Sequence, residues 1–166
     1  MNYKKLYEWA SKIQMNEKPS FNYIFRDADG TFSACNKFMG FNVLSLPEGI
    51  PFREETPFYL ASMLKWNADL YDYLICDAPH LYCIKIKECK TSEVSGKVVP
   101  YVMVGNSMYN ARYIKQAIDI MGKKAHFFKG ANWLSPLFIT ENEPSWTADC
   151  MIMPIRYNKN QIEEES

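Results

Sequence analysis

Four side chains that can bind metals lie close together near the middle of the chain. Cys76, His80, Cys83 and Cys89 follow the spacing C-x3-H-x2-C-x5-C. Zinc sites in proteins take four such nitrogen or sulfur ligands in a tetrahedron. The apolar alternation from Leu81 onward predicts a strand, and a straight strand would hold the last two sulfurs roughly 20 Å apart. The spacing also differs from the common zinc patterns. We therefore predict scattered buried thiols, with neither a metal nor a cofactor.

Catalytic chemistry has little support in the residue types. The chain has two histidines, His80 and His126, and lacks the GxSxG, P-loop and HExxH motifs. A cysteine nucleophile beside either histidine stays open, because spacing says nothing about their distance. Asp27 and Asp29 fall in an Asp-Ala-Asp-Gly turn signal, where Asp is expected for backbone reasons. We expect no enzyme and assign no catalytic residue.

A methionine-rich segment, Met151 to Arg156, offers binding chemistry instead. Methionine is flexible and polarizable, so it suits an apolar groove that accepts varied peptide side chains. The same alternation also fits ordinary core packing, since one face of a strand must be buried in any case. Pro154 favours a strand end or an edge strand, and that position would leave its neighbours reachable.

The bulk composition narrows the class of protein. A length of 166 residues fits one domain, or one domain with an insertion. Lys plus Arg balance Asp plus Glu at 19 each, so wholesale attraction to nucleic acid is not indicated. The charged N-terminal stretch does not resemble a signal peptide, and no apolar run reaches the length of a membrane span. With five cysteines, an odd number, the chain is expected to be cytoplasmic and to keep its thiols reduced.

Two helices are predicted from apolar residues at i, i+3, i+4 and i+7. The first covers residues 3–15. The second opens at Asn110 and stops at Gly122. The residues in these positions are Leu6, Trp9, Ala10 and Ile13, and then Ile114, Ala117, Ile118 and Met121.

Short strands follow each helix, which predicts a duplicated helix-plus-sheet unit. Helices on one side of an antiparallel sheet define an α+β fold. Pro100 would confine its strand to an edge or a bulge. The predicted strands cover parts of 21–46, then 70–76 and 81–89 joined by a hairpin loop at 77–80, then 98–104, 124–128, 136–140 and 148–155. A short helix at 57–66 and a polar loop at 91–97 complete the prediction.

The order of these elements resembles the bacterial DNA polymerase β sliding clamp family. The stretch YIFRDADGTFSACNKFMGFNVLSLPE, residues 23–48, resembles the family's strand, turn, strand, strand passage. The helix opened by Asn110, the segment LSPLFI at 134–139 and the ending MPIR at 153–156 resemble its C-terminal domain, which closes on a Met-Pro-Met-Arg-like tetrapeptide. The resemblance covers roughly 3–48 and 98–156.

The resemblance implies one DNA-clamp-like domain, two helices packed on antiparallel sheet, over residues 1–156. An insertion would occupy about 49–97, and 157–166 would form a mobile acidic tail able to cover the partner pocket. The family's subunit strings three such domains together, whereas this chain has one. The neighbouring domain's share of the pocket is therefore missing unless another chain supplies it.

The family's partner pocket, carried over by position, implies a peptide-binding site. Its residues would be Asn110, Tyr113, Leu134, Ser135, Pro136, Met151, Ile152, Met153, Pro154, Ile155 and Arg156. In the family the helices line the ring's hole and face DNA. The implied DNA-contacting residues are Lys4, Lys5, Lys12, Arg112 and Lys115. A solvated helix face is the plainer interpretation, because Glu8 and Asp119 dilute the charge.

The leading function is a sliding-clamp-like processivity or adaptor role. The chain would bind short apolar peptides of replication or repair proteins and, through its helices, duplex DNA. Closing a ring of about six domains would require copies of the chain to assemble. One alternative is a monomeric protein-binding module of clamp-like fold without DNA binding. Another is a small enzyme or zinc-binding protein centred on residues 76–89.

Overall fold

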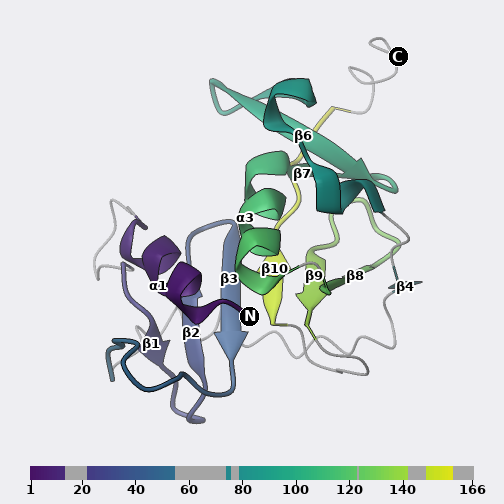
Figure 1. Ribbon diagram of the computed structural model, residues 1–166. Coiled ribbons are helices and arrows are strands. Elements are labelled where there is room, and N and C mark those ends of the chain that lie inside the picture. Colours follow the sequence, from purple (N-terminus) through teal and green to yellow (C-terminus); the bar gives the residue numbers. More distant parts are fainter. Residues whose placement is uncertain (14–21, 55–73, 76–78, 123, 142–148, 159–166) are drawn as a thin grey trace.

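The computed structural model describes residues 1–13, 22–54, 74–75, 79–122, 124–141 and 149–158. Within these ranges two helices pack on antiparallel sheets, which confirms the predicted α+β class (Figure 1). The short helix predicted at 57–66 and residues 159–166 of the predicted tail lie outside the described residues.

Both helices begin where they were predicted, but the first ends at Ser11, before the predicted end at residue 15. Helix α1 covers Tyr3–Ser11 and α3 covers Ala111–Met121. Each starts at an asparagine whose side chain accepts a backbone hydrogen bond from the first turn, Asn2 for α1 and Asn110 for α3. Gly122, at φ 94°, ends α3 as predicted.

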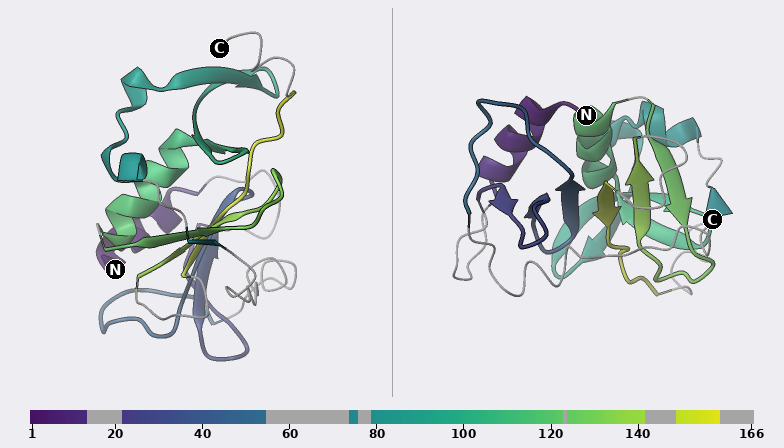
Figure 2. Two further views of the ribbon diagram at one scale, coloured as in Figure 1. Left: turned by 90° about the vertical axis from the view of Figure 1, so that its right-hand side faces the viewer. Right: turned by 90° about the horizontal axis from the view of Figure 1, so that it is seen from below.

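Seven strands form the larger sheet, which we call sheet A. Their order is β1-β2-β3-β10-β9-β8-β4, and all neighbours are antiparallel. Both helices cover one face of this sheet, as the view from below in Figure 2 shows. The strands are β1 (Phe25–Arg26), β2 (Phe32–Cys35), β3 (Met39–Val43), β4 (Leu74–Ile75), β8 (His126–Lys129), β9 (Leu137–Thr140) and β10 (Cys150–Ile152).

Sheet A contains the predicted repeat of a helix followed by strands. Helix α1 is followed by β1, β2 and β3, and α3 is followed by β8, β9 and β10. The two sets of three strands appear in the sheet in opposite orders and meet where β3 pairs with β10. Phe41 lies opposite Cys150 there, and Met39 lies opposite Ile152. All four of these side chains are buried in one hydrophobic core.

A second sheet of three strands, sheet B, lies over the first turn of α3. It consists of β5 (Lys90–Val94), β6 (Lys97–Val104) and β7 (Ser107–Asn110) in that order. The predicted polar loop at 91–97 is therefore wrong. Ser95 at φ 52° and Gly96 at φ 79° instead form a tight hairpin turn, because two positive φ angles match the twist of the flanking strands. Residues 74–75 and 90–97, within the predicted insertion, thus pair with the rest of the chain.

The expectation that Pro100 confines its strand to an edge or a bulge is also wrong, since β6 is the central strand of sheet B and its register with β5 is unbroken at Pro100. Val94 and Lys97 close the hairpin as a hydrogen-bonded pair, and such pairs alternate along an antiparallel ladder. Thr91 and Pro100 are then a non-hydrogen-bonded pair. An N–H at position 100, which proline lacks, would point toward β7. The pairing of β6 with β7 starts only at the next residue, Tyr101. The proline therefore costs no ladder bond.

The strand predicted at 81–89 is wrong as well. Two 3₁₀ turns occupy this stretch, η2 over Pro79–Cys83 and η3 over Ile86–Glu88. Leu81 is fully buried, and the Tyr82 ring packs edge-on against Phe127 at 5.4 Å. Burial of this segment against α3 and β8 therefore outweighs its strand-like pattern and determines its conformation. The strand argument against zinc therefore fails. Among the described residues, which exclude Cys76, no three His, Cys, Asp or Glu side chains are placed to hold a metal ion.

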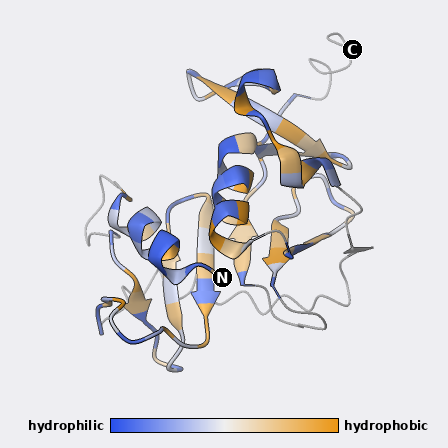
Figure 3. Cartoon of the chain, viewed as in Figure 1, coloured by the Kyte–Doolittle hydropathy of each residue, from blue (hydrophilic) through white to orange (hydrophobic). Residues whose placement is uncertain are grey.

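The apolar sides of both helices face sheet A. Leu6 and Ala10 of α1 are buried, as are Ile114, Ala117 and Ile118 of α3. In Figure 3 the side of the helices turned to the viewer shows mostly hydrophilic residues. No helix in the described part of the chain is long and apolar enough to cross a membrane.

Candidate peptide-binding site

Three consecutive residues of β7 hold three of the predicted site segments in place. The Met108 carbonyl accepts a hydrogen bond from the N–H of Ile155, at 2.7 Å. The next residue, Tyr109, donates its hydroxyl to the Ser135 carbonyl at 2.6 Å. Asn110 then caps α3, which carries Tyr113 in its first turn. One strand that was not predicted therefore brings together segments from residues 110, 135 and 155.

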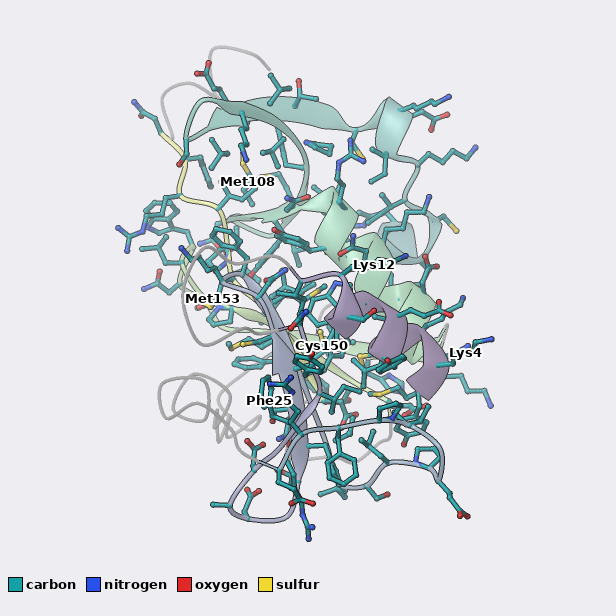
Figure 4. All side chains as sticks on the ribbon, turned by 90° about the vertical axis from the view of Figure 1, so that its left-hand side faces the viewer. Lys4, Lys12, Phe25, Met108, Cys150 and Met153 are labelled. Atoms are coloured by element: carbon teal, nitrogen blue, oxygen red, sulfur yellow. The ribbon has the colours of Figure 1, made fainter. Side chains whose placement is uncertain are left out.

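The closing segment, Met153–Arg156, runs from sheet A to sheet B. The Met153 N–H donates to the Phe38 carbonyl at 2.8 Å, just beyond the pairing of β10 with β3. Two residues later, Ile155 forms its bridge to Met108 of β7. Figure 4 labels Met153 and Met108 at the two ends of this crossing. The segment thus ties the two sheets together and keeps an exposed side chain, since Met153 is 39% exposed.

An aromatic pair lies beside this crossing. The rings of Phe38 and Tyr113 stack at 6.1 Å between centroids and 21° between planes. Phe38 is 52% exposed, whereas Tyr113 is half-buried, and burial raises the pKa of the Tyr113 phenol. We call Phe38, Tyr113 and Met153 the closing-segment patch. Phe38 and Met153 are exposed large apolar side chains, and exposed apolar side chains that group together are typical of a contact site.

The segment Leu134–Pro136 lies on the other flank of Met153. Asn132 accepts a hydrogen bond from the Leu134 N–H at 2.9 Å, and Tyr109 holds Ser135. Leu137 of β9 pairs with Ile152 of β10, so continuing this register by one residue places Pro136 beside Met153. The three residues of the segment are all half-buried.

The predicted peptide-site positions differ in what their side chains can offer. Ile152 is fully buried in the core, and Asn110 uses its side-chain oxygen to cap α3. Arg156 is exposed, and the remaining closing-segment positions Pro154 and Ile155 are half-buried, as is Met151 before them. Sequence reasoning missed Phe38. An Asn-Lys turn that precedes a large aromatic residue was the available signal.

The predicted DNA-contacting residues are all exposed. Lys4, Lys5 and Lys12 belong to α1 or its C-terminal cap, and Arg112 and Lys115 belong to α3. Figure 4 shows Lys4 and Met153 on opposite sides of the ribbon. Glu8 and Asp119 are exposed on the same helices. Lys4 thus lies away from the closing segment, whereas Arg112 directly precedes Tyr113 of the closing-segment patch.

The predicted burial of the thiols near the middle of the chain is wrong for Cys83, which is exposed, and for Cys89, which is half-buried. The buried thiols Cys35 and Cys150 are poor nucleophiles. Burial, with a further contribution from the Asp27 carboxylate, raises the pKa of Cys35 to about 12. Burial, with a smaller contribution from Asp149, also raises the pKa of Cys150 well above its ordinary value. Thiolates are the reactive form of cysteine, so both groups stay protonated and inert at neutral pH. Asp27 itself accepts a hydrogen bond from the buried Ser33 hydroxyl, next to the turn that the sequence predicted.

A solvent-open hollow of about 530 Å³ lies where the start of α1 meets the end of α3. Residues 1–3 and 119–122 line it, and none of the predicted peptide-site residues does.

Comparisons with protein-family models, curated proteins and solved structures find no match for this chain. What the protein does must therefore be inferred from its own residues.

Proposed function

We propose that this protein is a sliding-clamp-like adaptor that binds short apolar peptides of replication or repair proteins at the closing-segment patch. It acts in the cytoplasm and without catalysis. The observation that carries the proposal is the join of two helix-plus-three-strand units at β3 and β10, with the closing segment exposed beside α3. The clamp resemblance implies two helices packed on antiparallel sheet, and this arrangement is compatible with it.

The patch has the chemistry of a peptide contact. Stacked Phe38 and Tyr113 present flat apolar area, and the tyrosine adds a hydroxyl that can accept or donate a hydrogen bond. Met153 adds a flexible side chain that adapts to different ligand shapes. Aromatic residues and methionine are enriched at protein interfaces, which supports a protein partner for this surface.

A DNA contact would use the helix surfaces, where Lys4 lies on the other side of the ribbon from Met153. The exposed cations of α1 and α3 would meet phosphate groups without reading bases, and binding would weaken with salt. A ring of about six such domains would require copies of the chain to associate through closed symmetry. Encircling DNA is therefore a property of an assembly.

The second candidate is a monomeric peptide-binding module without DNA binding. The equal totals of 19 cationic and 19 acidic residues favour it, because nothing in the overall charge attracts a polyanion. Glu8 and Asp119 further reduce the positive potential of the helix surfaces.

Light scattering on a sizing column, with and without duplex DNA, separates the two candidates. A closed multimer that retains DNA would establish the clamp, and a monomer indifferent to DNA would favour the module. Both candidates use the closing-segment patch. A synthetic peptide that contains Leu next to Phe, titrated in parallel, tests whether this patch binds peptides. Tyr113→Ala combined with Met153→Ala should abolish its binding.

Leu44→Ala is the matched control for that double variant. Leu44 is 84% exposed and follows β3 directly, at the other end of the strand from Phe38. The Leu44→Ala variant should bind the peptide with the affinity of the unmodified protein. Equal affinity of the double variant and the unmodified protein would remove the patch assignment.

A further inference from the structure

A cation adjoins an apolar residue in each of the three segments that meet at the patch. Lys37 precedes Phe38, Arg112 precedes Tyr113, and Arg156 follows Ile155. All three cations are exposed. The hydrogen bond from Met153 to Phe38 and the stack of Phe38 on Tyr113 hold these segments together. Cations from three segments that lie far apart in the sequence are therefore next to residues of the patch or of its closing segment.

Acidic side chains are absent from the segments that build the patch. Residues 30–47, 110–118, 124–140 and 150–158 contain no Asp or Glu, although the chain has 19 in all. Asp149 and Glu141 lie toward the other end of the β9–β10 pair from Met153. The described segments that build the patch thus carry cations and no acidic residue, although the charges of the whole chain balance.

The start of α3 adds to this positive potential. Unpaired N–H groups at a helix N-terminus carry roughly half a positive charge, and anions are favoured near them. Tyr113 lies in the first turn of this eleven-residue helix. The helix dipole therefore adds to the positive potential of the neighbouring cationic side chains.

We infer that the patch selects peptides in which an apolar anchor, Leu or Phe, is flanked by Asp or Glu. This inference rests on the proposed function and specifies the chemistry of the partner. The anchor packs on Phe38, Tyr113 and Met153, and the acidic flanks pair with Arg112 and Arg156. Solvent-exposed charge pairs each change affinity by up to about fivefold, so the flanks together should contribute about tenfold.

Three fluorescent peptides of equal length test the inference by anisotropy. They share a Leu-Phe anchor and differ only in flanks of Glu, Gln or Lys. The Glu-flanked peptide should bind about tenfold more tightly than the Lys-flanked one. High salt should shrink this difference, because screening weakens exposed charge pairs. Arg112→Gln combined with Arg156→Gln should reduce it to about twofold or less.

Lys97→Gln serves as the control, because Lys97 is exposed in sheet B and lies outside the patch segments. It should leave the preference unchanged. Equal binding of all three peptides, with that binding still lost on changing Tyr113 and Met153 to Ala, would overturn the charge selection and leave the proposed function standing. Failure of all three peptides to bind would overturn both.

Discussion

The hydroxyl of Tyr109 donates a hydrogen bond to the backbone carbonyl of Ser135 at 2.6 Å. Tyr109 is fully buried in β7, and Ser135 lies in the segment that leads into β9. The bond therefore connects sheet B with the approach to sheet A. Together with the bridge from Met108 to Ile155, it holds both flanks of the candidate site on one strand.

Tyr109→Phe should lower the free energy of unfolding by about 1 kcal/mol, because a buried hydrogen bond is lost while the ring is kept. Urea denaturation measures the change. Tyr157→Phe is the matched control, since its hydroxyl also donates to a carbonyl, that of Asn106, but at an exposed position. A larger loss for the control than for Tyr109→Phe would contradict the anchoring role of β7.

Asn110→Ala should cost about 1 kcal/mol of unfolding free energy, because the first turn of α3 loses its capping acceptor. It should also weaken peptide binding, since this turn positions Tyr113. Asn2→Ala removes the equivalent cap from α1 and should cost a similar amount while leaving the affinity unchanged. Denaturation and a peptide titration on the same two variants measure both effects. Equal peptide affinity of the two variants would show that the Asn110 cap does not position the binding site.

Asp149→Asn should change how stability depends on pH. Burial raises the pKa of the Asp149 carboxyl from 3.8 to about 6 in the folded chain. Protonation therefore favours folding. This contribution is fully present below pH 3.8 and is lost as the pH rises through about 6. Asn cannot ionise and keeps an oxygen to accept the Glu141 N–H.

The Asn variant should therefore match the unmodified protein near pH 4 and exceed it in stability at pH 7. Thermal unfolding at a series of pH values gives the comparison. If the stability of the two proteins depended on pH in the same way across this range, the pH dependence would not come from Asp149.

Changing Lys4, Lys12 and Lys115 to Glu together should weaken duplex binding at low salt, because the change replaces three exposed positive charges with negative ones. Peptide binding should persist, since Lys4 lies on the other side of the ribbon from Met153 (Figure 4). A gel-shift titration over several salt concentrations measures the first effect. Unchanged DNA affinity would exclude the helix surfaces as the contact.

Helix positions followed directly from the sequence. Four apolar residues at helical spacing were enough to predict α1, and the same spacing with Asn110 before it and Gly122 after it predicted α3. The strands after each helix were also predicted, because turn signals such as Asp29-Gly30 separate them. Sheet B was partly missed. Its Ser95-Gly96 and Gly105-Asn106 turns are two-residue hairpin signals, and taking them as such would have indicated β5 and β7.

Tertiary packing decided what the local pattern could not. Leu81 and its neighbours alternate as a strand would, yet the buried surfaces of α3 and β8 hold them in 3₁₀ turns. Phe38 could not be placed at the site from spacing, because its contact with Tyr113 joins residues from separate units of the repeat. Long-range contacts of this kind leave no periodic trace in a sequence.

The position of β10 in sheet A has a consequence for folding during synthesis. This strand pairs with both β3 and β9, although it is the last strand in the described part of the chain. Until the ribosome releases residues 150–152, β3 and β9 both keep unpaired edges. Such edges attract other chains. Sheet A therefore stays incomplete during synthesis until β10 emerges, and a chaperone that shields these edges would raise the yield of folded protein.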